Sequence, residues 1–185
     1  MTLLDIRVLG DPILRAQTVR VERITDDLRA LVDRMFETMY AAQGIGLAAP
    51  QVGRTERLSV IDVDKAPLVI VNPEVIESSG SSKAEEGCLS IPDIYGDVQR
   101  PESVRVRYQD MDMQTREIDA EGLFGRCLQH EIDHLNGKLF IDYLSVIKRR
   151  AVMAKWQKEK DKYPGQIRTL TPSQVAQHHL RDEEL

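Results

Sequence analysis

Apolar residues recur at three- and four-residue steps after Thr25, which is the spacing of one face of an α-helix. The stripe consists of Leu28, Leu31, Val32, Met35, Phe36 and Met39. Thr25 can accept a hydrogen bond as the N-cap, and Asp26 and Asp27 suit the positive end of the helix dipole. The sequence therefore predicts a helix that starts after Thr25 and ends near Gln43 and Gly44.

Short runs in the middle of the chain have the composition or alternation of β-strands. They are residues 57–62, 68–71, 103–108 and 116–119. Val104, Val106 and Tyr108 alternate with arginines, as in a half-buried strand, and residues 110–113 would turn that strand into a hairpin. The Ser- and Gly-rich segment 78–84 is predicted to be a loop, and residues 44–51 a loop or irregular strand.

Two further helices are predicted near the C-terminus. One spans residues 122–136 and ends at Gly137, because glycine readily adopts the left-handed conformation after a helix. Ser145 would cap the other, which runs to about Lys162. A motif like a capping box at 171–174 would allow a short terminal helix. We predict an α+β domain with antiparallel sheet over residues 1–165, with the C-terminal helix at about 145–162, and a polar tail over 166–185.

Composition and charge narrow the class of protein. The chain has 185 residues, 42% of them hydrophobic, which is enough for one domain with a core. A net charge of −5 argues against a DNA-binding protein, and two loosely spaced cysteines suit a reducing compartment. We find no signal peptide and no apolar run near the roughly 20 residues of a membrane span. A cytoplasmic protein is expected by default, with a mature plastid form as the alternative.

The strongest chemical signal is His130-Glu131-Ile132-Asp133-His134, inside the second predicted helix. Residues four apart share one helical face, so the two imidazoles can bind the same metal ion. Glu131 can then serve as general base toward a metal-bound water. The alternative is a solvated helix with two histidines by chance, which is disfavoured because the chain has only four histidines.

A catalytic metal site needs a third ligand. The metzincin pattern would place a histidine six residues beyond His134, where this chain has Phe140. A distant glutamate therefore stays open, and so does Cys88, whose thiolate would suit zinc or ferrous iron. From composition alone, Cys88 fits an unreactive core residue at least as well.

Three segments resemble, in order, the signature motifs of the peptide deformylase family. They are Gly44-Ile45-Gly46-Leu47-Ala48-Ala49-Pro50-Gln51, Glu86-Gly87-Cys88-Leu89-Ser90 and Gln129-His130-Glu131-Ile132-Asp133-His134. Residues 8–15 and 136–142 are also similar to that family, so the likeness covers roughly residues 5–150. Three ordered motifs are far more specific than the histidine motif alone. The resemblance implies antiparallel sheets packed around a central helix that carries His130 and His134.

The resemblance also implies an activity, which is removal of the formyl group from the N-terminal formyl-methionine of nascent peptides, with release of formate. Cys88, His130 and His134 would hold one divalent ion, Fe²⁺ by preference, with Zn²⁺, Ni²⁺ or Co²⁺ as alternatives. Glu131 would carry the proton from water to the departing amine. The hydrolysis would thus depend on a single metal centre.

The same resemblance implies how substrate would be held. The side-chain amide of Gln51 and the backbone N–H of Leu89 would donate to the developing oxyanion. Gly46 and Gly87 would flank a peptide that adds as an extended strand.

The methionine side chain needs an apolar pocket. Candidates are Ile45, Leu123 and Cys127, and for Cys127 plain core packing is an equal alternative. Asp133 is expected to pair with Arg100 and support the histidines, unless it is simply exposed to solvent. Many bacterial family members carry arginine at the place of Tyr95, so this chain departs from them at the pocket rim.

The third predicted helix is strongly basic. It carries Lys148, Arg149, Arg150, Lys155, Lys158, Lys160 and Lys162. Docking to the ribosome is one interpretation, and a solvated helix face is the other. Two rival functions also stay open: a zinc metallopeptidase, which would be indifferent to Cys88→Ala, and a ribosome-associated binding module with a vestigial site, which would be indifferent to Glu131→Ala.

Overall fold

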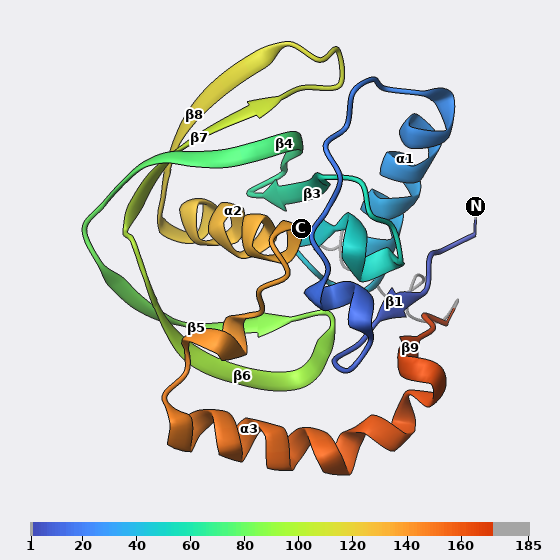
Figure 1. The fold of residues 1–185 in the computed structure, drawn as a ribbon, viewed down its shortest axis with the longest axis vertical. Coiled ribbons are helices and arrows are strands. Elements are labelled where there is room, and N and C mark those ends of the chain that lie inside the picture. The colour runs from blue at the N-terminus through green and yellow to red at the C-terminus, as the bar shows by residue number, and fades with distance from the viewer. Residues whose placement is uncertain (1, 172–185) are drawn as a thin grey trace, which may run out of the picture.

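The computed structural model of the chain describes residues 2–171 (Figure 1). The α-helices in this part of the chain are α1 (Asp26–Ala41), α2 (Gly122–Leu135) and α3 (Val146–Glu159). The strands are β1 (Ile6–Arg7), β2 (Gly46–Ala48), β3 (Leu58–Val63), β4 (Ala66–Ser79), β5 (Ser82–Cys88), β6 (Ile91–Arg100), β7 (Ser103–Gln109), β8 (Thr115–Glu121) and β9 (Ile167–Arg168). Short 3-10 helices are η1 (Pro12–Arg15), η2 (Ala49–Val52), η3 (Phe140–Tyr143), η4 (Lys160–Lys162) and η5 (Pro164–Gln166).

The strands surround α2. Five of them form an antiparallel sheet in the order β2-β3-β4-β7-β8, while β5 and β6 form a separate hairpin, and α2 lies between the two (Figure 1). Leu128 and Ile132 of α2 pack with Ile61 and Val106 of the large sheet. The predicted α+β fold, with antiparallel sheets around the helix of the histidine motif, is confirmed.

Helix α1 packs on β2 and β3, at one edge of the large sheet. It begins as predicted after Thr25, whose hydroxyl accepts a hydrogen bond from the Leu28 N–H at 3.2 Å. Met35 and Met39 are fully buried against β2 and β3, which is the outcome expected for an apolar stripe of helical period.

Helix α3 runs along the outside of β6 (Figure 1). The Ser145 hydroxyl caps it, as predicted, by accepting from the Lys148 N–H at 3.4 Å. Trp156 is the residue that α3 buries, and its ring stacks on Tyr163 with 5.8 Å between the centroids. None of the described helices combines the length and the apolarity of a membrane span.

The predicted strands are confirmed as β3, β4, β7 and β8, with β7 and β8 paired as a hairpin. Residues 44–51 form the short strand β2 and the start of η2. The predicted loop at 78–84 is wrong, because β4 continues to Ser79 and β5 starts at Ser82. These strand ends are polar and largely exposed, so they carry no apolar alternation that the sequence pattern could detect.

The expected tail after residue 165 does not begin there. Ile167 and Arg168 pair with β1, and Leu170 is buried beside Ile6. The described part of this segment therefore belongs to the domain. Ile167 and Leu170 are its apolar residues, and they are enough to hold it against β1. The rest of the tail, with residues 172–174 of the expected capping box, lies outside the described residues.

Candidate metal centre and cleft

The ligand atoms of Cys88, His130 and His134 converge on one point beside α2. Nε2 of His134 lies 3.3 Å from Cys88 Sγ and 3.2 Å from His130 Nε2, and the three ligand atoms all lie within 4.8 Å of one another. Around a tetrahedral ion, ordinary bond lengths give separations of about 3.6 Å for S···N and about 3.4 Å for N···N. The geometry therefore fits a divalent ion, and three protein donors leave a fourth position.

The charge around the histidines also favours a cation. Burial lowers the pKa of His134 well below its ordinary value, so this imidazole is neutral and can offer a lone pair. Burial opposes charge on His130 as well, but hydrogen bonds with Cys88 and Glu86 outweigh it and raise the pKa of His130 well above the ordinary value. Negative groups that hold a proton on His130 would equally attract a metal ion.

Glu131 lies beside this point and is almost fully buried. Burial raises the pKa of its carboxyl group to about 7, against the opposing effect of His130 and Arg100. Among the described residues, no group hydrogen-bonds to its buried Oε2. A carboxyl group with a pKa near neutrality and a free oxygen can both accept and release a proton.

Gly46 leaves the space that the Glu131 side chain occupies. A Cβ atom on Gly46 would lie 2.8 Å from Glu131 Cδ and closer still to the carboxylate oxygen. Only glycine fits at this position without displacing the carboxylate. This packing role was not predicted from the sequence, which pointed only to main-chain contacts with a peptide.

Gln51 and Leu89 flank Cys88. The Gln51 side chain is buried and accepts from the Ala48 N–H at 2.8 Å, so its NH₂ group is directed to Ser90 Oγ at 3.2 Å and Cys88 Sγ at 3.6 Å. Leu89 follows Cys88 directly and lines the same cleft. The amide of Gln51 is thus oriented with its donors toward Cys88 and the candidate metal centre.

A cleft of about 470 Å³ opens in front of these groups. Its walls come from the segments before β2 and at the end of β5, and its floor comes from α2. The lining includes all the predicted pocket and strand-flanking residues, namely Ile45, Gly46, Gly87, Leu123 and Cys127. Burial raises the pKa of the Cys127 thiol, which is therefore neutral and contacts the Ile45 carbonyl at 3.6 Å.

Known proteins are similar to this chain in sequence and fold. The family model for polypeptide deformylase matches residues 3–150. The chain belongs to the peptide deformylase family. It is 54% identical to the peptide deformylase of Mesorhizobium japonicum, over 86% of this chain and 95% of the relative, and 50% identical to that of Alkalilimnicola ehrlichii, over 85% and 91%.

Solved deformylase structures agree with the fold. The enzyme of Legionella pneumophila is 48% identical with a TM-score of 0.82, covering 86% of this chain and 96% of that one. The enzyme of Synechococcus elongatus in complex with actinonin is 46% identical with a TM-score of 0.80, covering 84% and 86%. This deformylase removes the N-formyl group from the formyl-methionine of newly synthesised peptides, and its family is metal-dependent.

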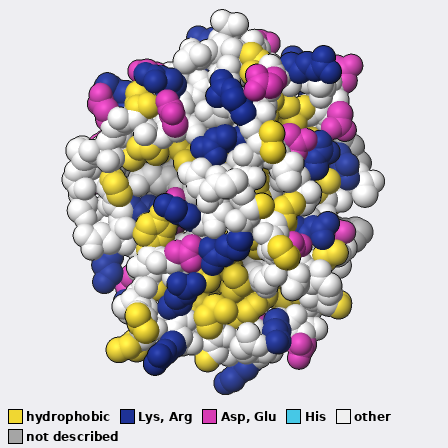
Figure 2. Space-filling model, in the orientation of Figure 1, with side chains coloured by type: hydrophobic (Ala, Val, Ile, Leu, Met, Phe, Trp, Pro, Cys, Tyr) yellow, Lys and Arg dark blue, Asp and Glu magenta, His cyan; other side chains and the backbone are white. Residues whose placement is uncertain are grey.

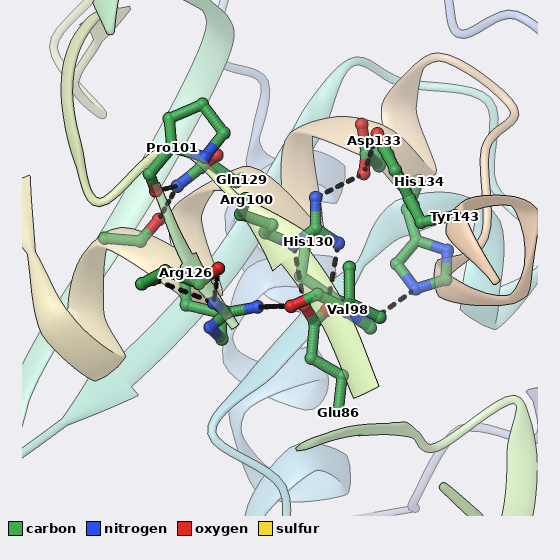
Figure 3. A network of polar contacts seen from close by, with 12 residues as sticks. Glu86, Val98, Arg100, Pro101, Arg126, Gln129, His130, Asp133, His134 and Tyr143 are labelled. Atoms are coloured by element: carbon green, nitrogen blue, oxygen red, sulfur yellow. Dashed lines mark hydrogen bonds and ion pairs between the residues drawn. The ribbon is translucent and has the colours of Figure 1, made fainter. Parts of the chain in front are cut away.

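Glu86 is the main residue of this deformylase that the sequence did not single out. Its Oε1 accepts from His130 Nδ1 at 2.9 Å, while Arg100 and Arg126 donate to it at 2.7–2.9 Å (Figure 3). Burial opposes its charge, but hydrogen bonds from His130 and Arg100 hold the pKa of Glu86 at about 2. Glu86 thus orients His130 with Nε2 toward Cys88 and His134. The sequence signal that could have identified Glu86 is its place two residues before Cys88, within the second motif.

The expected pairing of Asp133 with Arg100 is confirmed, at 2.8 Å (Figure 3). The Tyr143 hydroxyl donates to the same carboxylate oxygen at 2.8 Å, and Arg100 lies over the Tyr143 ring. Asp133 therefore reaches His130 through Arg100 and Glu86, because the arginine lies between the two carboxylates.

Proposed function

We propose that Cys88, His130 and His134 hold the divalent ion of this deformylase. Convergence of their three ligand atoms beside Glu131 is the observation that carries the proposal. When bound there, the ion would supply Lewis acidity and a water acidic enough to attack at neutral pH. The protein holds one soft sulfur donor and two imidazoles at distances that fit tetrahedral coordination, which suits a transition metal better than calcium or magnesium.

Glu131 moves the proton. It takes the proton of the attacking water as the oxygen adds to the formyl carbon, and it gives that proton to the peptide nitrogen as the C–N bond breaks. A pKa near 7 suits both steps, because the carboxylate is a sufficient base and its acid form a sufficient donor. Formate and a peptide with a free amino terminus are the products.

Gln51 and the Leu89 N–H stabilise the negative charge that develops on the formyl oxygen. The Gln51 donors are held in place before reaction by the Ala48 N–H and Ser90. Loss of one such preorganised donor costs about 3 kcal/mol of barrier.

The peptide enters as an extended strand between β2 and β5. Each of these is the edge strand of its sheet, so each has main-chain groups free of a second strand partner. Gly46 and Gly87 would meet the peptide backbone from the two sides, and Ile45, Leu123 and Cys127 would surround the methionine side chain. Ile45 and Leu123 are 40% and 58% exposed at present, and such apolar exposure favours an apolar occupant.

Ferrous iron is our proposal for the ion, with zinc, nickel and cobalt as alternatives. The test is an assay of formate release from a formyl-methionyl peptide by anaerobically purified protein, with metal analysis of the same sample. We expect activity to follow iron content and to fall on exposure to air. Cys88→Ala should lose both metal and activity, whereas a metallopeptidase without Cys88 as a ligand would keep both. Absence of formate release from metal-loaded protein would contradict the proposal.

We further propose that α3 docks this enzyme on the ribosome, in the cytoplasm. Figure 2 shows Lys and Arg side chains gathered near hydrophobic ones at the lower edge, over α3. Val146 and Ile147, at the start of α3, are 69% and 81% exposed, and the basic residues follow directly. Exposed apolar side chains next to cations suit a surface that binds RNA and protein together.

Charge reversal tests this docking. Arg150→Glu with Lys158→Glu changes two exposed cations of α3, and Arg23→Glu with Lys65→Glu makes the same change elsewhere. Salt-sensitive co-sedimentation with ribosomes should fall for the first pair only, with peptide deformylation unchanged for both. Equal binding by the two variants would refute docking through α3.

A further inference from the structure

The C-terminal strand β9 lies beside the turn that follows Cys88 and carries Leu89. Its pairing with β1 sets Arg168 opposite the fully buried Ile6. From there Nη1 of Arg168 donates to the Leu89 carbonyl at 3.2 Å. Arg168 stands beyond residue 150, where the match to the deformylase family model ends, and it lines the cleft.

Leu89 is held from several directions. A Cβ on Gly44 would lie 2.7 Å from Leu89 Cδ1, so this side chain rests on the segment before β2. Leu170 packs in a cluster with Leu89 from the C-terminal side. The next carbonyl, of Ser90, accepts from the Leu9 N–H at 2.9 Å. Both chain ends therefore brace the turn between β5 and β6.

We propose that Arg168 is a positioning residue for deformylation, which holds the Leu89 main chain so that its N–H points at the developing oxyanion. This inference rests on the proposed role of Leu89. The N–H in question lies between Cys88, anchored at the metal centre, and a carbonyl anchored by Arg168. A donor lowers the barrier only if it already points at the oxyanion before the reaction. If it has to reorient during the reaction, the reorientation costs the free energy that the hydrogen bond would contribute.

Steady-state kinetics of metal-loaded variants on a formyl-methionyl peptide test the role. Arg168→Met removes every side-chain donor and keeps an unbranched side chain as far as the place of Nε, and Arg168→Lys restores one charged donor. Arg29→Met is the matched control. Arg29 lies on α1 and, like Arg168, donates to a backbone carbonyl, that of Met111, at 3.3 Å. Thermal unfolding and metal content are measured on every sample.

We expect Arg168→Met to lower kcat about tenfold, which is less than the 10²–10³-fold fall that follows complete loss of an oxyanion donor. KM should change less than twofold, and metal content should stay the same. Arg168→Lys should recover kcat to within about threefold of the parent, and Arg29→Met should equal the parent. If Arg168→Met fails to fold, Arg168→Gln is measured instead, with an expected kcat between those of the Met and Lys variants.

Several results would overturn the inference: an unchanged kcat in Arg168→Met, a rise in KM with kcat intact, or a loss that Lys does not recover. Failure of the proposed function is distinguishable, because then Gln51→Ala would also deformylate like the parent protein, or the parent would release no formate. A parent that is active and impaired by Gln51→Ala, but indifferent to Arg168→Met, would refute only the role of Arg168.

Discussion

Burial raises the pKa of Glu131 to about 7, yet the proposed mechanism also requires its carboxylate to reach the substrate. Gly46 reconciles the two requirements, because its missing side chain gives the carboxylate a place at the cleft wall. His130 depends in the same way on Glu86, which occupies its second ring nitrogen. At the scale of single residues, the chemistry of the site is therefore set by neighbours that do not react.

Gly46→Ala should abolish most activity and destabilise the fold by about 1–3 kcal/mol, because the new methyl group overlaps the Glu131 carboxylate. Denaturant unfolding measures the loss. In a Glu131→Ala background the methyl group has room, so the same substitution should cost far less stability. An equal cost in both backgrounds would contradict this account of Gly46.

Glu86→Gln should weaken metal binding about 10- to 100-fold, because His130 Nδ1 loses its charged acceptor and two buried arginines lose their carboxylate. Asp133→Asn should weaken it less, since Asp133 acts through Arg100. Competition with a chromophoric chelator measures both affinities. Equal effects of the two substitutions, or none from Asp133→Asn, would contradict the proposed order of support.

At the scale of elements, the site lies where α2, β5 and the segment before β2 meet. Two outer elements, α3 and η1, pack against segments next to it. Helix α3 is anchored through few residues, with Trp156 in a cluster that contains Ile94 of β6 and Phe140 of η3. The N-terminal segment is fastened by an ion pair between Arg15 of η1 and Asp142 of η3. Both contacts hold segments that border β5 and β6.

Trp156→Ala should cost about 3–5 kcal/mol of unfolding free energy, because it empties the core under α3. Ile147→Ala removes a side chain from the same helix that is 81% exposed, so its effect should stay within about 0.5 kcal/mol. Denaturant titration measures both values. Similar losses for the two variants would mean that α3 is not anchored at Trp156.

The ion pair of Asp142 should make stability depend on pH. Burial opposes its charge, but hydrogen bonds from Arg15 and the Leu139 N–H outweigh it and lower the pKa of Asp142. A lowered pKa in the folded state stabilises the protein above the ordinary pKa of about 4, and this stabilisation is lost as pH falls. Asp142→Asn should thus cost about 1 kcal/mol at pH 7, and this cost should shrink as pH falls below about 4 through the lowered pKa of Asp142. A difference independent of pH would contradict the ion pair.

At the scale of the whole molecule, the proposed metal ion connects the β5–β6 hairpin to the central helix. Cys88 belongs to one and the histidines to the other, and the described chain has no disulfide, since Cys88 and Cys127 are both free. A ligand that binds only the folded state stabilises it in proportion to the logarithm of its concentration over its Kd.

Removal of the ion with a chelator should therefore lower the thermal midpoint, by an amount equivalent to about 3–4 kcal/mol when the ion had been at 100–1,000 times its Kd. Scanning calorimetry of the parent and of Cys88→Ala measures the change. The variant should not respond to the chelator, and a parent equally unresponsive would refute the proposed ligand set.

Local patterns determined much of this protein in advance. The helical periods, the caps at Thr25 and Ser145 and the four-residue spacing of His130 and His134 depend on neighbours in sequence, so the sequence alone predicts them. The ordered motifs then implied Cys88 as the third ligand. The unpredicted strand β5 is mostly polar and exposed, so no apolar alternation marks it. Strand β6 buries Ile94 and Val98, but Pro92 and Gly96, which disfavour strands, interrupt its pattern.

Only the tertiary structure decided which distant groups meet. Cys88 and His134 are 46 residues apart, Glu86 and His130 are 44 apart, and Leu89 and Arg168 are 79 apart. Such contacts result from the packing of the β5–β6 hairpin on α2 and from the pairing of β9 with β1. Burial then changes the pKa values of the enclosed groups. Periodicity describes one element at a time, so it cannot assign Glu86 to His130 or place a C-terminal arginine at Leu89.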